Sequence, residues 1–362
     1  MADGKGGDDQ GKQTYDAPIH DDRPFSMDPT KMPPEVGAPL AAYAGEEPPS
    51  PQWFKDAIAR EPERTFVESL GSKLEVLTWG DVGKPGMLMV HGNSAHAEWW
   101  SFIAPFFADD YRVASMSLAG MGASDWRARY AFTDFAEDAE AVARAAGLYE
   151  GGVKPVYVGH SFGGGQVFHA AAAHPERMAC AVLVDTGFGG PPPEVLAERE
   201  KRAAEIRNIP TPDKPSRIYP TLTAALGRFR LMPPQPAGNP YIADFIARRS
   251  LKRAPLADGS GEGWTWRFDP DMWAKLDRTG MMPPSQDPAA ERAGAIATPM
   301  AHIFGANSRI MDRRRSGQPS PFPPGMIEVE IPDSHHHVMI DQPLALVAAI
   351  RALLAAWPHP RT

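Results

Sequence analysis

The sequence predicts an α/β fold with a mostly parallel central sheet, helices on both faces of the sheet, and an inserted, mainly helical cap domain. Short apolar runs alternate with helix-like segments along most of the chain, and repeated strand–helix units form parallel sheets. This alternation stops between residues 189 and 286, where helix-like pieces and Pro-rich turns follow one another. The core is therefore expected from residues 53–188 and 287–362, and the cap from residues 189–286.

The core elements are predicted in order along the chain. Residues 65–69 and 74–79 are typical of a hairpin that turns at Gly71-Ser72-Lys73. The run GMLMV at residues 86–90 is continuously apolar, which indicates a strand buried on both faces. Further strands are expected at residues 112–118, 153–158, 181–184, 300–304 and 327–331, and helices at residues 99–108, 134–146, 163–173 and 343–357.

The predicted cap has helix-like segments at residues 194–207, 220–229 and 242–251. Its stretch from residue 199 to residue 253 has twelve Lys or Arg and four Asp or Glu, in a chain whose net charge is −8. This local excess of positive charge is either a solvated helix surface or a feature that attracts anionic, carboxylate-bearing substrates.

Composition and charge exclude several classes of protein. No run of about 18 apolar residues is present, so neither a transmembrane helix nor a membrane partner is expected. The net charge of −8 argues against general nucleic-acid binding. Cys180 is the single cysteine and excludes an intramolecular disulfide. The first 22 residues lack the apolar segment of a secretory signal, which favours a cytoplasmic location.

Residues 1–52 are expected to form an N-terminal arm. They contain nine Pro and six Gly, a composition that buries little apolar surface. The arm is therefore predicted to be mostly disordered or loosely draped. In the alternative interpretation it packs on the domain or on a neighbouring subunit through Phe25, Tyr43 and Trp53, which leaves a homodimer open.

A serine lies in a Gly-x-Ser-x-Gly pattern at residues 159–163, between a predicted strand and a glycine-rich helix start. In this context the serine occupies a strained turn beside which little except glycine fits. The turn exposes the hydroxyl at a helix N-terminus, whose dipole favours negative charge. Ser161 is therefore the predicted nucleophile. The glycine spacing does not match that of dinucleotide sites, so no such cofactor is expected.

Histidines for a general base lie at residues 335–337, after the last predicted strand and before the final helix. A serine hydroxyl needs such a base to accept its proton at neutral pH. A loop at this place can return to the carboxyl edge of the sheet, but the residues alone leave the choice among the three histidines open. Three adjacent side chains point in different directions, so no metal site is expected here.

An oxyanion hole is predicted where His91-Gly92-Asn93 ends the first buried strand. Gly92 lets the backbone turn and offers the next N–H to a developing negative charge. The expected donors are the backbone N–H groups of Asn93 and of Phe162, and the Asn93 side chain is a further candidate. His91 is expected to hold the loop, and His96 has no assigned role.

These motifs resemble those of the α/β-hydrolase superfamily over roughly residues 65–357, with the insertion as the cap domain. They are His91-Gly92-Asn93, GMGASD at residues 120–125, GHSFGG at residues 159–164 and SHHHVMIDQP at residues 334–343, in the family's order. In the family the catalytic histidine usually follows a glycine and precedes Glu/Asp-Gln-Pro. The resemblance thus implies His336 as the base, with His337 as the runner-up.

A catalytic triad consists of a nucleophile, a histidine base and an acidic residue. The position of the acid in this chain departs from the commoner family pattern. Many members carry it in a Gly-x-x-Asp turn after the strand that corresponds to residues 300–304, where this chain has Gly305-Ala306-Asn307-Ser308. Haloalkane dehalogenases of one group and zearalenone-type lactonases place the acid one strand earlier. The resemblance then implies Asp185, with Asp312 as the alternative. In a purely structural interpretation, Asp185 only caps a loop.

The resemblance and the serine together imply a carboxylic ester or lactone hydrolase that acts through an acyl-enzyme. The enzymatic alternative is carbon–carbon bond hydrolysis of the meta-cleavage-product type. The non-enzymatic alternative is a receptor that has the hydrolase fold but no catalytic activity. The similar dehalogenases and epoxide hydrolases use an aspartate where this chain has Ser161, so their reactions are not implied. No metal and no cofactor is expected.

The expected partner is a small-molecule ester or lactone, held in an apolar pocket that suits a bulky substrate. Arg230 or Arg228 is the candidate partner of a substrate carboxylate. The candidates for the wall are Trp100 or Trp99, Phe162, Phe188, Phe229, Leu231, Met232, Trp266 and Met339.

Overall fold

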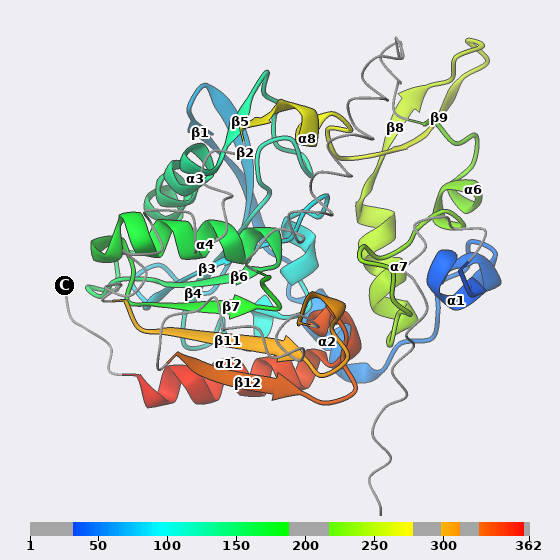
Figure 1. Ribbon diagram of the computed structural model, residues 1–362. Coiled ribbons are helices and arrows are strands. Elements are labelled where there is room, and N and C mark those ends of the chain that lie inside the picture. The colour runs from blue at the N-terminus through cyan, green and yellow to red at the C-terminus, as the bar shows by residue number, and fades with distance from the viewer. Residues whose placement is uncertain (1–31, 188–216, 278–297, 312–325, 358–362) are drawn as a thin grey trace, which may run out of the picture.

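An eight-stranded sheet forms the centre of the computed structural model, which describes residues 32–187, 217–277, 298–311 and 326–357. Within this sheet the first two pairs of neighbours are antiparallel and the other pairs are parallel. The predicted α/β fold with a mostly parallel sheet is therefore confirmed. In spatial order (Figure 1), the strands are β1 (Glu63–Ser69), β2 (Ser72–Trp79), β4 (Arg112–Met116), β3 (Gly86–Val90), β6 (Val156–His160), β7 (Cys180–Val184), β11 (Met300–Gly305) and β12 (Ile327–Ile331).

Helices cover both faces of the sheet in Figure 1: on one face α3 (Phe132–Ala145) and α4 (Phe162–Ala173), on the other α2 (Gln52–Ala59) and α12 (Pro343–Ala356). Successive side chains of a strand point to opposite faces. Met87 of β3 accordingly packs in the cluster with α12, and Leu88 packs in the cluster with α3 and α4. Among the described residues, no helix has the length and apolar character needed to cross a bilayer.

The helix predicted at residues 99–108 is replaced by two separate 3₁₀ helices, η3 (Ala97–Trp100) and η4 (Ala104–Phe106). Pro105 lies in the first turn of η4, and proline lacks the N–H that a continuous helix would need there. The remaining short elements are α1 (Pro34–Gly37), η2 (Ala41–Tyr43), β5 (Tyr130–Ala131), η5 (Pro175–Arg177), η6 (Arg309–Met311) and α11 (Val338–Asp341).

The described part of the insertion contains helices, as predicted. It also contains a hairpin, which the sequence analysis did not predict. The predicted helix at residues 242–251 corresponds to α7 (Pro240–Arg249), and the one at residues 220–229 is reduced to α6 (Leu222–Leu226). The helix predicted at residues 194–207 lies outside the described residues. The elements are α6 (Leu222–Leu226), α7 (Pro240–Arg249), the antiparallel strands β8 (Leu251–Pro255) and β9 (Glu262–Trp266), α8 (Met272–Lys275) and β10 (Leu276–Asp277), which pairs with β5.

The described part of the N-terminal arm lies against helix α7. Arg248 of α7 donates a hydrogen bond to the backbone oxygen of Gly45 at 2.6 Å. Tyr43 and Trp53 pack against the larger apolar cluster, as the alternative interpretation of the arm expected. Phe25 and the other residues before 32 lie outside the described residues.

Candidate active site

Ser161 lies at the junction between β6 and α4, with a φ of 52° and a ψ of −114°. A positive φ is strained for a residue with a side chain and is typical of functional turns. A Cβ atom at Gly163 would lie 2.3 Å from the backbone oxygen of His91, and one at Gly159 would lie 2.5 Å from the backbone oxygen of Gly163. Glycine is therefore required on both sides of the serine, as the sequence pattern predicted.

His336 and Asp185 are in direct contact with each other. The ring nitrogen Nδ1 of His336 lies 2.7 Å from Oδ1 of Asp185, and both side chains are almost wholly buried. A carboxylate only accepts hydrogen bonds, so Nδ1 of His336 donates and the neutral ring keeps Nε2 free of a proton. Asp185 directly follows β7 and has a φ of 44°. The two residues predicted as base and acid are thus brought together.

The carboxylate of Asp185 receives two further hydrogen bonds from the neighbouring strand end. Ser308 donates its hydroxyl to Oδ1 at 2.6 Å, and the backbone N–H of Gly305 donates to Oδ2 at 2.9 Å. Ser308 occupies the position at which the sequence analysis expected the commoner acid. It supplies a donor to Asp185, a role that the sequence analysis missed. Asp312, the alternative acid, lies outside the described residues.

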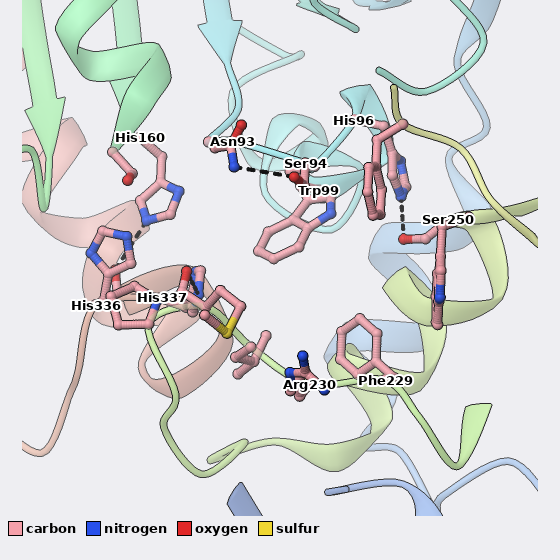
Figure 2. A pocket seen from close by; sticks show the side chains of 18 of the residues that line it. Asn93, Ser94, His96, Trp99, His160, Phe229, Arg230, Ser250, His336 and His337 are labelled. Carbon is pink, nitrogen blue, oxygen red and sulfur yellow. Dashed lines mark hydrogen bonds between the residues drawn. The ribbon is translucent and has the colours of Figure 1, made fainter. Parts of the chain in front are cut away.

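A cavity of about 480 Å³ opens over Ser161 and His336 (Figure 2). Among the predicted wall residues, Phe229, Leu231, Met232 and Trp266 line it, as do both candidate arginines. Of the tryptophan pair, Trp99 lines the cavity and Trp100 does not. Phe188 lies outside the described residues.

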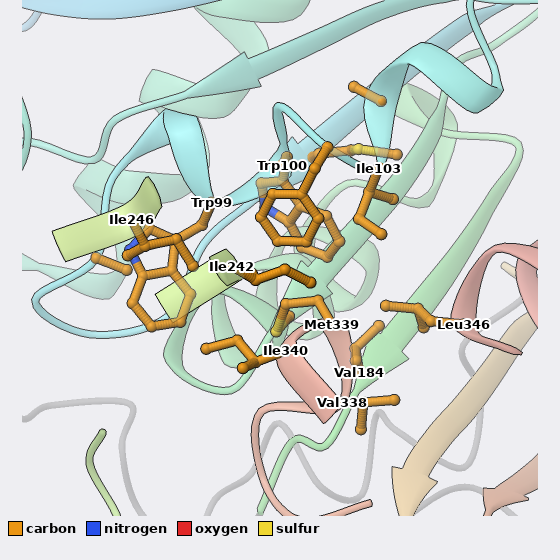
Figure 3. Packing of buried hydrophobic residues seen from close by; sticks show 14 of the residues in the cluster. Trp99, Trp100, Ile103, Val184, Ile242, Ile246, Val338, Met339, Ile340 and Leu346 are labelled. Atoms are coloured by element: carbon orange, nitrogen blue, oxygen red, sulfur yellow. The ribbon is translucent and has the colours of Figure 1, made fainter. Parts of the chain in front are cut away.

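Trp100 and Met339 belong to the apolar core, which corrects their assignment to the pocket. Both are almost wholly buried and share a cluster with Ile242 and Ile246 of α7 (Figure 3). Adjacent residues of a helix point in different directions, so Trp100 turns into the core while its neighbour Trp99 reaches the cavity. The pattern of apolar residues could not distinguish these two orientations.

The two expected oxyanion donors belong to segments next to the serine. A Cβ atom at Gly92 would lie 3.4 Å from Cβ of Ser161, so the backbone at residues 92–93 passes beside the serine. Phe162 is the first residue of α4, where backbone N–H groups have no partner within the helix. Its ring packs against Phe135 and the half-exposed Trp273 and does not line the cavity, which corrects its assignment to the pocket wall. The Asn93 side chain donates to Ser94 Oγ at 3.1 Å (Figure 2).

His91 and His96 have structural roles. His91 Nδ1 lies 2.7 Å from the backbone oxygen of Gly92, and its Nε2 accepts the backbone N–H of Leu118 at 3.0 Å. His91 therefore holds the loop, as predicted. His96 lies with Nε2 2.8 Å from Ser250 Oγ, which connects the loop after β3 to the end of α7 (Figure 2).

The loop that contains the histidines is anchored by hydrogen bonds to the insertion. The side chain of Gln235 accepts the backbone N–H of His337 at 2.9 Å and donates to Asp341 at 3.0 Å. Asp341 also accepts the backbone N–H of His335 at 2.8 Å. The His335 ring lies with Nδ1 3.0 Å from the same carboxylate, so His335 helps to hold the loop. The sequence analysis did not predict the two contacts of Gln235, because they join residues 106 and 102 positions apart.

Burial keeps several histidines of this region neutral. It lowers the pKa of His91 to about 4 and lowers the pKa of His96 well below 6.5. Burial also lowers the pKa of His160 and of His337 well below 6.5, and the nearby His336 adds to both shifts. All four rings are thus uncharged at neutral pH.

Acid is therefore expected to destabilise the protein from about pH 6.5 downward. In the unfolded chain these four histidines titrate near 6.5, so below that pH the unfolded state binds more protons than the folded state. Each histidine then lowers the free energy of unfolding by up to about 1.4 kcal/mol per pH unit, until the pH falls below its folded pKa. Urea unfolding between about pH 7.5 and pH 5 measures this slope. A free energy of unfolding that stays constant over this range would contradict the prediction.

Comparison with known proteins agrees with this fold. A family model described as "Alpha/beta hydrolase family" matches residues 87–350. Among solved structures, an E-2-(acetamidomethylene)succinate hydrolase has a TM-score of 0.62 and 20% identity, over 82% of this chain and 100% of that one. An esterase of M. tuberculosis has a TM-score of 0.57 and 21% identity, over 88% of this chain and 98% of that one. At such identities these similarities show the fold alone.

Sequence relatives include proteins named for different reactions. Lipase LipV of Mycobacterium tuberculosis is 37% identical over 113 residues, which are 31% of this chain and 41% of that protein. Fluoroacetate dehalogenase of Burkholderia is 28% identical over 107 residues, which are 28% of this chain and 34% of that protein. The chain thus spans well under half the length of these curated relatives.

Proposed function

Because the chain belongs to the alpha/beta hydrolase family, we propose that it hydrolyses a carboxylic ester or lactone through an acyl-enzyme on Ser161. The observation that supports this most directly is the 2.7 Å contact between His336 and Asp185, in the same cavity wall as a serine on a strained turn. A serine with a histidine and a carboxylate is the combination that activates a hydroxyl for attack on an acyl carbon.

Each of these groups has one role in the proposed reaction. Ser161 Oγ attacks the carbonyl carbon of the substrate while Nε2 of His336 accepts the hydroxyl proton. Asp185 holds the proton on Nδ1 and stabilises the imidazolium that forms. The backbone N–H groups of Asn93 and Phe162 bind the oxyanion. His336 then gives its proton to the leaving alcohol and activates the water that hydrolyses the acyl-enzyme.

The cavity supports a bulky, largely apolar substrate. Its volume of about 480 Å³ suits a ligand much larger than acetate. Trp99, Phe229 and Trp266 supply aromatic surface on its wall. The aromatic surface favours an aromatic or alicyclic group on the acyl or the alcohol side of the substrate.

The cavity is also positively charged. Among the described residues, its wall includes Arg228, Arg230 and Arg267 and contains neither Asp nor Glu. Arg230 is partly buried and makes no ion pair with any described residue. A partly buried guanidinium without a carboxylate partner favours an anionic ligand, because an arginine pairs with a carboxylate through two parallel hydrogen bonds. We therefore propose that the preferred ester or lactone has a carboxylate at a distance from the scissile bond.

Replacing Arg230 by glutamine is expected to impair turnover of carboxylate-bearing esters. A hydrogen-bonded charge pair contributes about 1.5–3 kcal/mol, so kcat/KM falls roughly 10- to 100-fold, mainly through KM. Neutral esters of the same size should lose less than about threefold, since they make no such pair. The control is Arg253→Gln, which removes a cap arginine outside the cavity wall. Equal losses for charged and neutral esters would contradict this role of Arg230.

Active-site labelling and a substrate panel test the proposed function. A fluorophosphonate is expected to label the purified protein at Ser161. The panel contains p-nitrophenyl esters and aryl lactones, with and without a carboxylate, and turnover of one of these groups is expected. A vinylogous diketone, an epoxide and fluoroacetate complete the panel. Turnover confined to the diketone would favour carbon–carbon hydrolysis, and turnover of the epoxide or fluoroacetate alone would contradict the serine mechanism.

A folded protein that neither reacts with the fluorophosphonate nor converts any member of the panel would contradict the proposed function. Circular dichroism and thermal unfolding of the same preparation establish that the protein is folded. That outcome would favour the non-catalytic alternative, in which the cavity binds a ligand without converting it.

A further inference from the structure

Three imidazole rings lie together at the base of the cavity, although the proposed reaction uses only one. His160 ends β6, and His336 and His337 belong to the loop before α11. The ring centroids lie 4.8 Å apart for His160 and His336, 5.2 Å apart for His160 and His337, and 4.8 Å apart for His336 and His337. All three side chains line the cavity (Figure 2). One nitrogen of each ring lies within 4.8 Å of one nitrogen of the other two.

Each ring has one nitrogen directed at a fixed acceptor. Nε2 of His160 lies 3.0 Å from the backbone oxygen of His336, and Nε2 of His337 lies 3.2 Å from the backbone oxygen of Met232. Nδ1 of His336 lies 2.7 Å from the carboxylate of Asp185. Carbonyl and carboxylate oxygens only accept hydrogen bonds, so these three nitrogens carry the protons. Each neutral ring therefore keeps one nitrogen with a free lone pair.

Two of these lone pairs have no use in the proposed reaction. Nδ1 of His160 and Nδ1 of His337 are buried and have no hydrogen-bond partner in the described structure. Both residues are at least nine-tenths buried. A buried acceptor without a partner costs about 1–3 kcal/mol. The arrangement thus favours an occupant that brings positive charge or a donated proton to the lone pairs.

We propose that His160, His336 and His337 form a binding site for a divalent transition-metal cation such as Zn²⁺, with one nitrogen from each ring as a ligand. Imidazole is a preferred ligand of Zn²⁺, whereas Mg²⁺ and Ca²⁺ prefer oxygen. Hydrogen bonds from the second ring nitrogen to carbonyl or carboxylate oxygens are the arrangement that orients metal-binding histidines. Zn–N distances are about 2.0–2.1 Å, so two nitrogens on one tetrahedral cation lie about 3.3 Å apart, and the rings must move toward one another on binding. The cavity leaves the fourth position to water or to a ligand.

Metal binding at this place has a consequence that rests on the proposed function. The cation takes a nitrogen of His336, and the ring can then no longer accept the proton of Ser161. Zn²⁺ is therefore expected to inhibit hydrolysis reversibly, with one cation bound per chain, and a chelator restores the rate. The binding itself does not depend on any activity of the protein.

Cobalt absorption and calorimetry test the site directly. Metal-free protein is titrated with Co²⁺, which gives intense visible bands when it is bound with low coordination number by nitrogen ligands, and Zn²⁺ should displace it. One Co²⁺ per chain is expected. His337→Gln should weaken Zn²⁺ binding in calorimetry by at least about tenfold, since it removes one of three ligands. The matched control is His174→Gln, which changes a histidine outside the cavity wall, near Glu137 and Glu176, and should bind Co²⁺ as the natural chain does.

A measurement on the unchanged protein covers the case in which His337→Gln does not fold. In long-range ¹H–¹⁵N spectra of the histidine rings, Zn²⁺ should shift the nitrogens of three rings and leave His335 and His174 unchanged. Absence of the cobalt bands, equal binding by His337→Gln, or shifts confined to other histidines would overturn the site. Cobalt binding by a protein without hydrolase activity would contradict the proposed function and leave the metal site standing. Hydrolysis by a protein that binds no Co²⁺ would overturn the metal site and leave the proposed function standing.

Discussion

Ser161→Ala is expected to abolish hydrolysis, with kcat lowered on the order of 10⁴- to 10⁶-fold. The variant keeps the cavity and the oxyanion donors but lacks the oxygen that attacks the substrate. Alanine has the same Cβ atom as serine, so the strain at a φ of 52° is unchanged and the turn should form as before. The rate with the best ester of the panel and the loss of fluorophosphonate labelling measure the effect.

The chain offers a matched control for this substitution. Ser94 also lines the cavity and also has a positive φ, 57°. Ser94→Ala therefore removes a hydroxyl from the same cavity, at a residue whose backbone conformation is comparable to that of Ser161. It should lower the rate by less than about tenfold, because among the described residues its hydroxyl accepts a single hydrogen bond, from Asn93. Similar losses in both variants, or labelling that persists in Ser161→Ala, would exclude Ser161 as the nucleophile.

Asp185→Asn is expected to lower kcat about 10⁴-fold, because an amide does not hold His336 in the required tautomer. Among the described residues, the carboxylate accepts three donors, namely the His336 ring, the Ser308 hydroxyl and the Gly305 N–H. An asparagine side chain has one oxygen, so its NH₂ group must face at least one of these donors. The thermal midpoint should therefore fall as well, and the rate is measured below it.

Two further variants distinguish the possible acids. Asp312→Asn should keep the natural rate if Asp185 is the acid. Ser308→Ala removes one of the three hydrogen bonds to Asp185 and leaves its charge, so a loss of about three- to tenfold is expected. Loss of activity in Asp312→Asn together with full activity in Asp185→Asn would reverse the assignment.

Local patterns were sufficient for most of the core. Continuous apolar runs such as residues 86–90 identify strands that are buried on both faces, because no other short element needs apolar side chains at every position. The hairpin β8–β9 was missed, since β8 has a buried residue only at its first position and the alternation in β9 covers only five positions. The helix predicted at residues 99–108 was wrong because Pro105 interrupts it.

Some residues of the candidate site could likewise be found from local patterns, and others could not. Ser161 could be found from the sequence, since only glycine fits sterically at the nearby positions 159 and 163. Asp185 was selected by resemblance alone, and residues far apart in the chain hold it. Ser308, 123 residues away, donates to it, and His336 lies 151 residues away. His160 was treated only as part of the serine motif, yet its ring packs beside the rings of His336 and His337.

The sequence by itself determined most strands and helices of the core and the turn at Ser161, because side-chain periodicity and glycine sterics act between near neighbours. Only the tertiary structure decided which tryptophan of the pair at residues 99 and 100 faces the cavity and which donors surround Asp185. It also decided that His160, His336 and His337 meet. These features depend on the angles at which distant segments pack, and no pattern along a single chain records those angles.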